Sequence, residues 1–208
     1  MQVALLTTVL PEGRRTGGEI VSQTLVEALR AAGHQVGVVG YQRPDAPPAT
    51  DAGAVPAGTR TIETGRAGRG QVARWMADAV RRGLPYSVAK YRSDEYLAAA
   101  RTAVAGADVV LVDHAQVGWA LDELRPTVPV VLVAHNVEHE LYAEQRASGA
   151  LPRRLVYGRE ERRMRALERR LAAAAAQVWV LTEADAAAFA RLARPGAVRR
   201  FGVPGQAP

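Results

Sequence analysis

The 208-residue sequence contains no cysteine. This absence excludes disulfide bonds and thiolate metal sites. Aromatic residues make up only 5% of the chain, so the core must consist mainly of valine, leucine and alanine. No apolar run reaches the roughly 18 residues that a membrane-spanning helix requires. With 48% hydrophobic and 23% charged residues, the composition is typical of a soluble globular protein.

Lysine is nearly absent as well, since Lys90 is the only one and all other basic side chains belong to arginine or histidine. The net charge of +6 favours anionic partners such as phosphate groups or anionic lipid. The apolar start of the chain has no basic leader before it and therefore predicts a buried strand instead of a signal peptide. We expect a cytoplasmic protein, with peripheral contact to a membrane as an open alternative.

Short apolar segments alternate with segments of helical periodicity along the whole chain. This alternation predicts an α/β fold with a doubly wound, mostly parallel, Rossmann-like sheet in a single domain. We place the domain at residues 1–200 and the start of a linker or tail at residues 201–208. The expected strands are residues 3–6, 36–39, 60–63, 108–113, 129–134, 177–181 and 198–203, the expected helices are residues 20–29, 72–80, 94–104, 153–176 and 183–192, and the expected surface loop is residues 42–58.

Ligands of such sheets bind at the carboxyl ends of the strands, near the point where the strand order reverses. Polar clusters follow three of the expected strands: residues 13–18, Asp113-His114 and His135-Asn136. Residues 13–18 read Gly-Arg-Arg-Thr-Gly-Gly, and such glycines let backbone N–H groups approach a phosphate at a helix N-terminus. The cluster matches neither a Walker A loop nor the dinucleotide fingerprint, so a plain strand-to-helix turn stays open as well.

Residues 135–139 read His-Asn-Val-Glu-His, which matches the H-x-x-E-H pattern of some zinc hydrolases. That pattern requires both histidines on one helical face, whereas His135 closes an expected strand and His139 lies beyond the following turn. We therefore place His135 at the floor of a cleft and Asn136 near the start of the next helix as its cap. His139 is then structural or exposed, and we expect no metal site.

Residues 153–170 hold eight arginines against three glutamates, a net charge of +5. Met164, Leu167 and Leu171 recur at helical spacing, so one face of this segment should pack inward. The charged face is either simply solvated or contacts anionic lipid or a phosphorylated acceptor. We expect no sequence-specific binding of nucleic acid, because no recognised module and no interleaved aromatic residues accompany the charge.

Three features, in the right order along nearly the whole chain, resemble family 4 retaining glycosyltransferases of the GT-B fold. They are Gly17-Gly18 opening a helix that ends at residues 33–36, the apolar strand followed by residues 135–138, and the Arg/Glu-rich helix that leads to residues 178–183. Residues 83–87, Gly-Leu-Pro-Tyr-Ser, also resemble a sugar-transferase subgroup of that family. The sequence contains no Asp-x-Asp, the usual metal signature of the other main glycosyltransferase fold.

The resemblance implies two Rossmann-like domains with the active site between them, of which this chain is the acceptor-binding N-terminal one. It implies that Gly17 and Gly18 approach the donor phosphate or sugar with backbone amides and that His135 is catalytic and contacts the transferred sugar. A nucleotide sugar is then the donor substrate, and no cofactor is needed. The implied partners are a C-terminal donor-binding domain, on the same or a separate chain, and a sugar or lipid-linked acceptor. The further candidates for the acceptor site or the cleft are Arg14, Arg15, Thr16, Asp113, His114, Asn136 and Glu138.

The family's donor-binding half has no counterpart in these 208 residues. We therefore expect the chain to be inactive, or nearly so, without that half. Two other functions stay open: a binding or regulatory module that kept the fold without catalysis, and a zinc hydrolase built on H-x-x-E-H.

Overall fold

Every strand of the central sheet runs parallel to its neighbours in the computed structural model, which describes residues 1–202. The strand order is β3-β2-β1-β4-β5-β6-β7, and it reverses direction between β1 and β4. This is the switch point at which ligands of such sheets bind. The strands are β1 (Gln2–Val9), β2 (Gln35–Gln42), β3 (Ala54–Thr59), β4 (Val109–Asp113), β5 (Val130–Ala134), β6 (Gln177–Val180) and β7 (Val198–Arg200).

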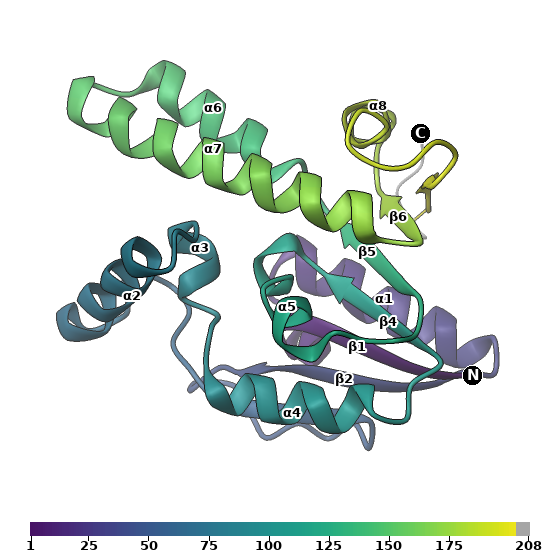
Figure 1. The fold of residues 1–208 in the computed structure, drawn as a ribbon. Helices are drawn as coiled ribbons and strands as arrows, with labels where there is room; N and C mark the ends of the chain where they lie inside the picture. The colour runs from purple at the N-terminus through teal and green to yellow at the C-terminus, as the bar shows by residue number, and fades with distance from the viewer. Residues whose placement is uncertain (203–208) are drawn as a thin grey trace.

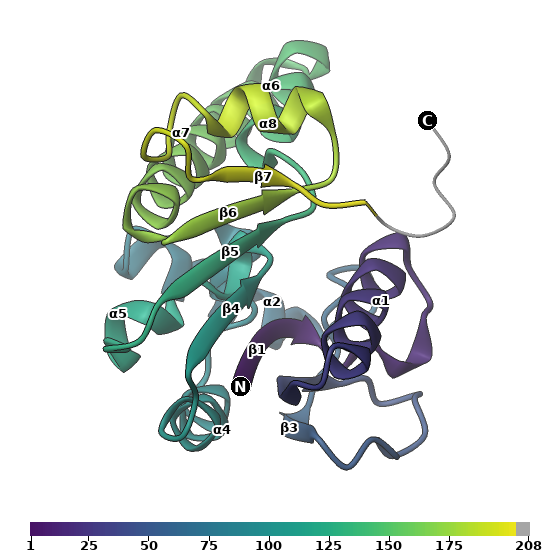
Figure 2. The same ribbon diagram turned by 90° about the vertical axis from the view of Figure 1, so that its right-hand side faces the viewer.

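Helices cover both faces of the sheet, as expected for a doubly wound fold (Figure 1, Figure 2). On one face, Leu25 and Val26 of α1 pack with Val3 and Leu5 of β1. Helices α4, α5, α7 and α8 pack on the opposite face, within a second and larger apolar cluster. Because both faces are buried, the central strands are almost entirely apolar. The helices are α1 (Gly17–Ala31), α2 (Arg69–Arg81), α3 (Tyr86–Ala89), α4 (Asp94–Val104), α5 (Ala120–Leu124), α6 (Glu138–Ser148), α7 (Leu151–Ala174) and α8 (Glu183–Phe189), with short 3-10 turns η1 (Pro11–Gly13) and η2 (Ala115–Val117).

The expected third strand at residues 60–63 is wrong. The strand at this edge is β3, Ala54–Thr59, which lies within the expected loop and contains Pro56 and Gly58. Both residues weaken a strand prediction, but an edge strand tolerates them because one of its sides has no partner to bond. Residues 203–208 of the expected linker or tail lie outside the described residues.

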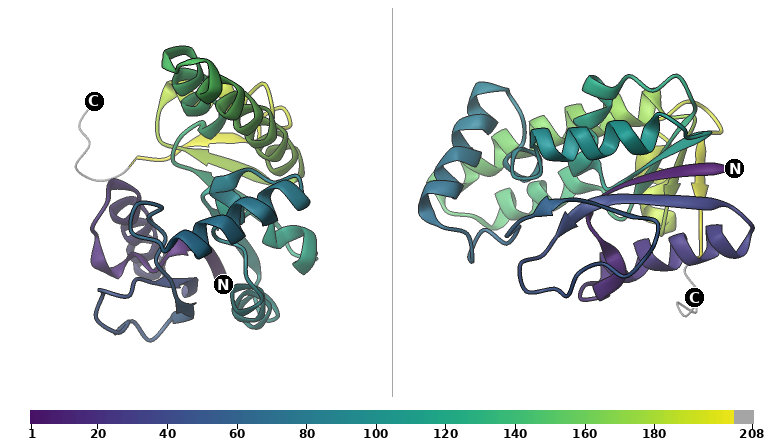
Figure 3. Two further views of the ribbon diagram at one scale, coloured as in Figure 1. Left: turned by 90° about the vertical axis from the view of Figure 1, so that its left-hand side faces the viewer. Right: turned by 90° about the horizontal axis from the view of Figure 1, so that it is seen from below.

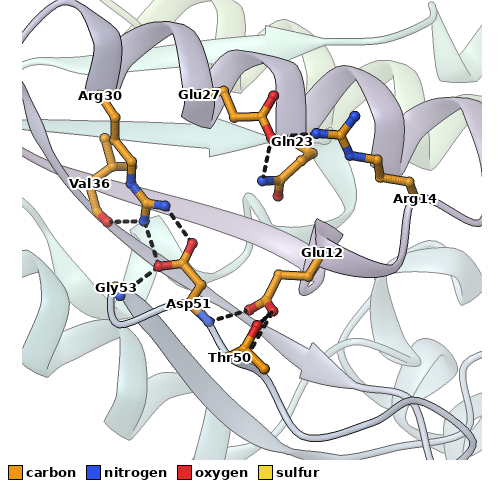
Figure 4. A network of polar contacts seen from close by, with 9 residues as sticks. All are labelled: Glu12, Arg14, Gln23, Glu27, Arg30, Val36, Thr50, Asp51 and Gly53. Carbon is orange, nitrogen blue, oxygen red and sulfur yellow. Dashed lines mark hydrogen bonds and ion pairs between the residues drawn. The ribbon is translucent and has the colours of Figure 1, made fainter.

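The loop between β2 and β3 is held against α1 and η1 by two carboxylates (Figure 4). Asp51 accepts hydrogen bonds from both terminal nitrogens of Arg30, at 2.6 and 2.9 Å. Glu12 accepts from the backbone nitrogens of Thr50 and Asp51, at 2.9 and 3.2 Å. These contacts hold the turn that leads into α1 against the loop between β2 and β3, which positions the start of that helix.

Helices α2, α3 and α6 and the start of α7 project beyond the carboxyl ends of the strands (Figure 1, Figure 3). Arg163 of α7 links α7 to α2 and to the turn after α2 by donating to the carbonyl oxygens of Ala79 and Leu84, at 2.9 and 3.0 Å. Within residues 1–202, no helix is long and apolar enough to cross a membrane.

Candidate functional site

A cavity of about 550 Å³ opens at the carboxyl ends of β1, β4 and β5, at the switch point of the sheet. The N-terminus of α1 forms one wall, and residues between β2 and α4 form another. Residues that line the cavity include Thr7, Thr16, Gly17, Gly18, Glu19, Ser22, Arg43, Tyr91, His114, Gln116, His135, Asn136 and Glu138.

Asp113, the last residue of β4, lies fully buried beneath this cavity. Its Oδ2 atom accepts hydrogen bonds from the hydroxyls of Thr7 and Ser22, at 2.7 and 2.6 Å. Its Oδ1 atom is 2.6 Å from Nε2 of His135. Burial alone would raise the pKa of Asp113, but the neighbouring imidazoles and these hydrogen bonds hold that pKa well below its usual range. Asp113 is therefore a carboxylate at neutral pH.

His135 follows β5 and is held in one orientation by this carboxylate. Because ionised Asp113 can only accept, Nε2 of His135 must carry the proton of the hydrogen bond between them. Nδ1 is then a proton acceptor whenever the ring is neutral. This atom is buried and has no hydrogen-bond partner among residues 1–202. Buried polar atoms normally have hydrogen-bond partners, so an unpaired nitrogen at the edge of a cavity is suited to accept a hydrogen bond from a ligand.

His114 stacks on His135, with ring centroids 3.9 Å apart and planes inclined by 23°. Its backbone φ is +77°, a conformation rare for residues other than glycine and one that costs about 1–3 kcal/mol. Burial lowers the pKa of His114 to about 4, against an opposing pull from Asp113, so this ring is neutral at pH 7. A neutral ring can stack on His135 without placing two cations face to face.

The N-terminus of α1 presents backbone donors to the same cavity. Thr16 caps the helix by accepting from the backbone nitrogen of Glu19 at 3.2 Å, which leaves the first amides, those of Gly17 and Gly18, without a partner in the helix. The Glu19 carboxylate is paired with the Arg43 guanidinium at 2.7 Å, so its negative charge at the helix start is balanced. The helix dipole and the free amides together favour an anionic group at this wall.

Glu138, the first residue of α6, lies on the side of the cavity near Tyr91 and Gln116. Burial raises the pKa of Glu138, and the charge of Glu168 adds to this effect. Burial also raises the pKa of Tyr91 to about 12, so its phenol stays protonated. This wall offers hydrogen-bonding groups that suit the hydroxyls of a sugar, among them the protonated phenol of Tyr91 and the amide of Gln116.

The structure gathers most of the sequence-derived candidates at the cavity, though not all of them. Arg14 and Arg15 turn away from it, toward Glu27 and Asp45. The expected Asn136 cap is wrong: α6 is preceded by Val137, and its first amides donate to the buried carboxylate of Glu168.

Thr7 and Ser22 were not anticipated from the sequence. Ser22 lies four residues after Gly18, on the same helical face, and that spacing could have indicated it.

The two histidines of the H-x-x-E-H pattern serve separate pairs. His139 is buried and its Nδ1 atom is 2.7 Å from the carboxylate of Glu168, so it is structural. Asp113, His114 and His135 do offer three ligand-type atoms within 4.8 Å of one another. However, Nε2 of His135 is only 2.6 Å from Asp113, whereas two ligands of one zinc ion lie roughly 3.3 Å apart. Nε2 of His135 and Asp113 are a hydrogen-bonded pair, and the two histidines of the H-x-x-E-H pattern do not share one metal site.

One family model matches most of the chain, and solved structures share its fold. The model of the glycosyl transferase 4-like domain matches residues 16–204. A sucrose-phosphate synthase from Thermosynechococcus elongatus shares the fold with a TM-score of 0.56 at 18% identity, over 96% of this chain and 47% of that protein. A second structure of that synthase gives a TM-score of 0.55 at 16% identity, over 98% of this chain and 90% of its own. No curated protein sequence matches. The chain thus spans about half the length of the first of these structures and has the fold of one half of a GT-B enzyme.

Proposed function

The chain belongs to the glycosyl transferase 4-like family, and we propose that it is the acceptor-binding N-terminal half of a retaining glycosyltransferase that uses a nucleotide sugar. The donor-binding half, on the same or a separate chain, would close the cavity from the opposite side. Without it, one wall of the active site is missing and the chain should not transfer sugar.

The observation that carries this proposal is the buried pair of Asp113 and His135, with Nδ1 of His135 unpaired at the cavity. Asp113 fixes which nitrogen of His135 holds the proton and which way the ring faces. A sugar hydroxyl can then donate to Nδ1. Because the ring is held on one side by the carboxylate and stacked on the other by His114, little orientational freedom is lost on binding.

Charge stabilisation is the task of the N-terminus of α1, which lies beside the two imidazoles. When the bond between the sugar and its phosphate breaks, negative charge develops on the departing phosphate oxygen. The amides of Gly17 and Gly18 at the N-terminus of α1 are oriented donors of the kind that stabilise such charge. The glycine at position 18 also lets the helix start approach the two imidazoles closely.

The acceptor would bind toward Glu138, Tyr91 and Gln116, whose side chains offer hydrogen-bonding groups to the cavity. A sugar or lipid-linked hydroxyl can both donate to and accept from such groups. Asn136 is exposed at the cavity rim.

The test is His135→Ala in the protein joined to its donor-binding half. Transfer should fall about 100-fold or more, since a positioned polar group in an active site commonly contributes that much. Circular dichroism should show a folded domain. His34→Ala is the matched control, because His34 lies at the opposite ends of the strands, between α1 and β2. Full transfer by the His135 variant would remove this residue from the site.

The isolated chain provides a second test. We expect no turnover of any sugar donor and only weak nucleotide binding by calorimetry. A micromolar nucleotide affinity of the isolated chain would contradict the assignment of donor binding to the other half.

A further inference from the structure

Five large apolar side chains, here called the helical tip, are exposed on the two helices that project beyond the cavity. The described residues contain eight exposed side chains of this kind, so more than half of them gather on α2 and the start of α7. Their exposed fractions are 57% for Met76, 67% for Val80, 76% for Leu151, 72% for Leu155 and 58% for Val156.

Contacts between α2 and α7 bring these side chains to one end of the molecule. Arg159 and Arg163 of α7 both donate to the carbonyl oxygen of Ala79, at 3.2 and 2.9 Å. Val80 follows Ala79 directly, and Leu155 precedes Arg159 by about one helical turn. The ribbon views agree that α2 and the start of α7 lie at the same end (Figure 1, Figure 3).

The helical tip is separate from the faces that these helices use for packing. Helix α2 buries Trp75 and Ala79, and the Trp75 ring meets the edge of Tyr86 with centroids 6.3 Å apart. Helix α7 buries Met164 and Leu167 farther along its length. The exposed apolar residues therefore lie outside the core, and exposed apolar groups of this kind are typical of an interaction surface.

Arginines surround the helical tip. Arg153 and Arg154 stand between Leu151 and Leu155, all of them exposed, and no ion pair involves either arginine within residues 1–202. Exposed arginines also flank the apolar residues of α2, where Asp78 is the single acidic residue and pairs with two of them. They are Arg69, Arg74, Arg81 and Arg82.

We propose that the helical tip docks on the anionic surface of a lipid membrane. Apolar side chains interleaved with arginines at the end of projecting helices are complementary to such a surface, which takes the apolar groups between its headgroups and the arginines beside its phosphates. A protein partner would need a face that is both acidic and apolar and that matches the shape of the helical tip. An anionic membrane offers negative charge and apolar groups and needs no matching shape. The carboxyl ends of the strands point to the same end, so docking would bring the cavity near the membrane (Figure 1). The docking itself does not depend on the proposed transferase activity.

Vesicle co-sedimentation of the full chain tests this proposal. The probes are vesicles of phosphatidylcholine alone and vesicles that also contain 30% phosphatidylglycerol, each at low and at 0.5 M salt. We expect binding only to the anionic vesicles, and weaker binding in high salt because salt screens the arginines. Replacing Arg153 and Arg154 with Gln should lower the partition coefficient about 30-fold, since each basic residue near an anionic surface strengthens binding about fivefold. Replacing Met76 and Val80 with Ser should lower it about tenfold or more.

Matched variants elsewhere provide the controls. Arg101→Gln with Arg191→Gln removes two exposed arginines from α4 and from the segment after α8, and Ile20→Ser removes an exposed apolar residue from α1. Both should bind like the unchanged chain. The proposal is overturned if the chain does not bind anionic vesicles, or if the variants of the helical tip bind them as strongly as the control variants do. Far-ultraviolet circular dichroism shows that each variant is folded.

Discussion

Gly18 lies so close to His114 that a methyl group on its α carbon would stand 3.3 Å from Cε1 of that imidazole. The same methyl would be 3.7 Å from Nδ1 of His135. The stacked imidazoles and the start of α1 therefore depend on one another for their positions. Four predictions follow from this cluster and from the buried pairs around it.

Gly18→Ala should leave the domain folded, with its free energy of unfolding within about 1 kcal/mol of the original value. Alanine favours a helix over glycine by up to about 1 kcal/mol, which offsets the tight contact with His114. Transfer by the complete enzyme should fall about tenfold or more, because the imidazoles must shift by a few tenths of an ångström. Steady-state kinetics and denaturant unfolding measure the two effects. Gly17→Ala is the comparison, since its added methyl meets no atom within 4 Å and should leave the histidine resonances in an NMR spectrum unmoved. Unmoved resonances in the Gly18 variant would disprove the contact.

Asp113→Asn should lower transfer by about 100-fold and destabilise the domain by about 3 kcal/mol. The amide keeps the size of the carboxylate but loses the charge that fixes His135, and it presents a donor to groups that now donate to Asp113. Ser22→Ala removes a single hydrogen bond to the same carboxylate and should cost only about 1–2 kcal/mol. Kinetics combined with urea unfolding separates the two roles. Equal losses of activity in both variants would mean that the negative charge of Asp113 is not needed for transfer.

His139→Ala should destabilise the domain by about 3–5 kcal/mol, because it leaves the carboxylate of Glu168 fully buried without its imidazole partner. Any active protein that remains should have a nearly normal KM. His135→Ala should also destabilise the domain, because it leaves Asp113 buried without its imidazole partner, but unlike His139→Ala it should abolish transfer by the protein that remains folded. A zinc hydrolase would instead lose stoichiometric zinc in both variants, which metal analysis of the purified proteins can detect.

The stability of the domain should decrease as the pH falls from about 6.5 to about 4. The pKa of His114 is about 4 in the folded chain, below its ordinary value, so only the unfolded chain binds this proton in that range. The lost stability amounts to about 3 kcal/mol at most, and to less where water reaches the half-buried ring. Urea unfolding at a series of pH values measures it. His114→Asn should flatten the profile, since asparagine tolerates a positive φ and does not titrate. A profile unchanged by this variant would show that His114 is not the titrating group.

The alternation of strands with the longer helices could be predicted because each buried strand is a short apolar run and helices such as α1 and α4 bury an apolar face. The edge strand β3 could not be predicted, because Pro56 and Gly58 indicate a loop in most sequences. A strand that has a hydrogen-bonded neighbour on only one side tolerates both residues. The prediction failed at the strand whose own sequence favours a strand least and which is held in the sheet by pairing with β2.

The candidate site could be predicted in part for a related reason. His135 and His114 follow strands whose carboxyl ends meet, so their proximity follows from the topology. The directions of side chains do not follow from it. Arg14 and Arg15 belong to the right loop but pair with Glu27 and Asp45 outside the cavity, and such choices depend on tertiary partners far along the chain.

Both margins of the sheet are poor templates for further strands. Pro56 removes one backbone donor from β3, and β7 has only three residues, two of which are the charged Arg199 and Arg200. Natural sheets use these same devices against edge-to-edge aggregation. The two edge strands therefore disfavour pairing with the sheet of another copy, while the cavity at the ends of the strands stays open.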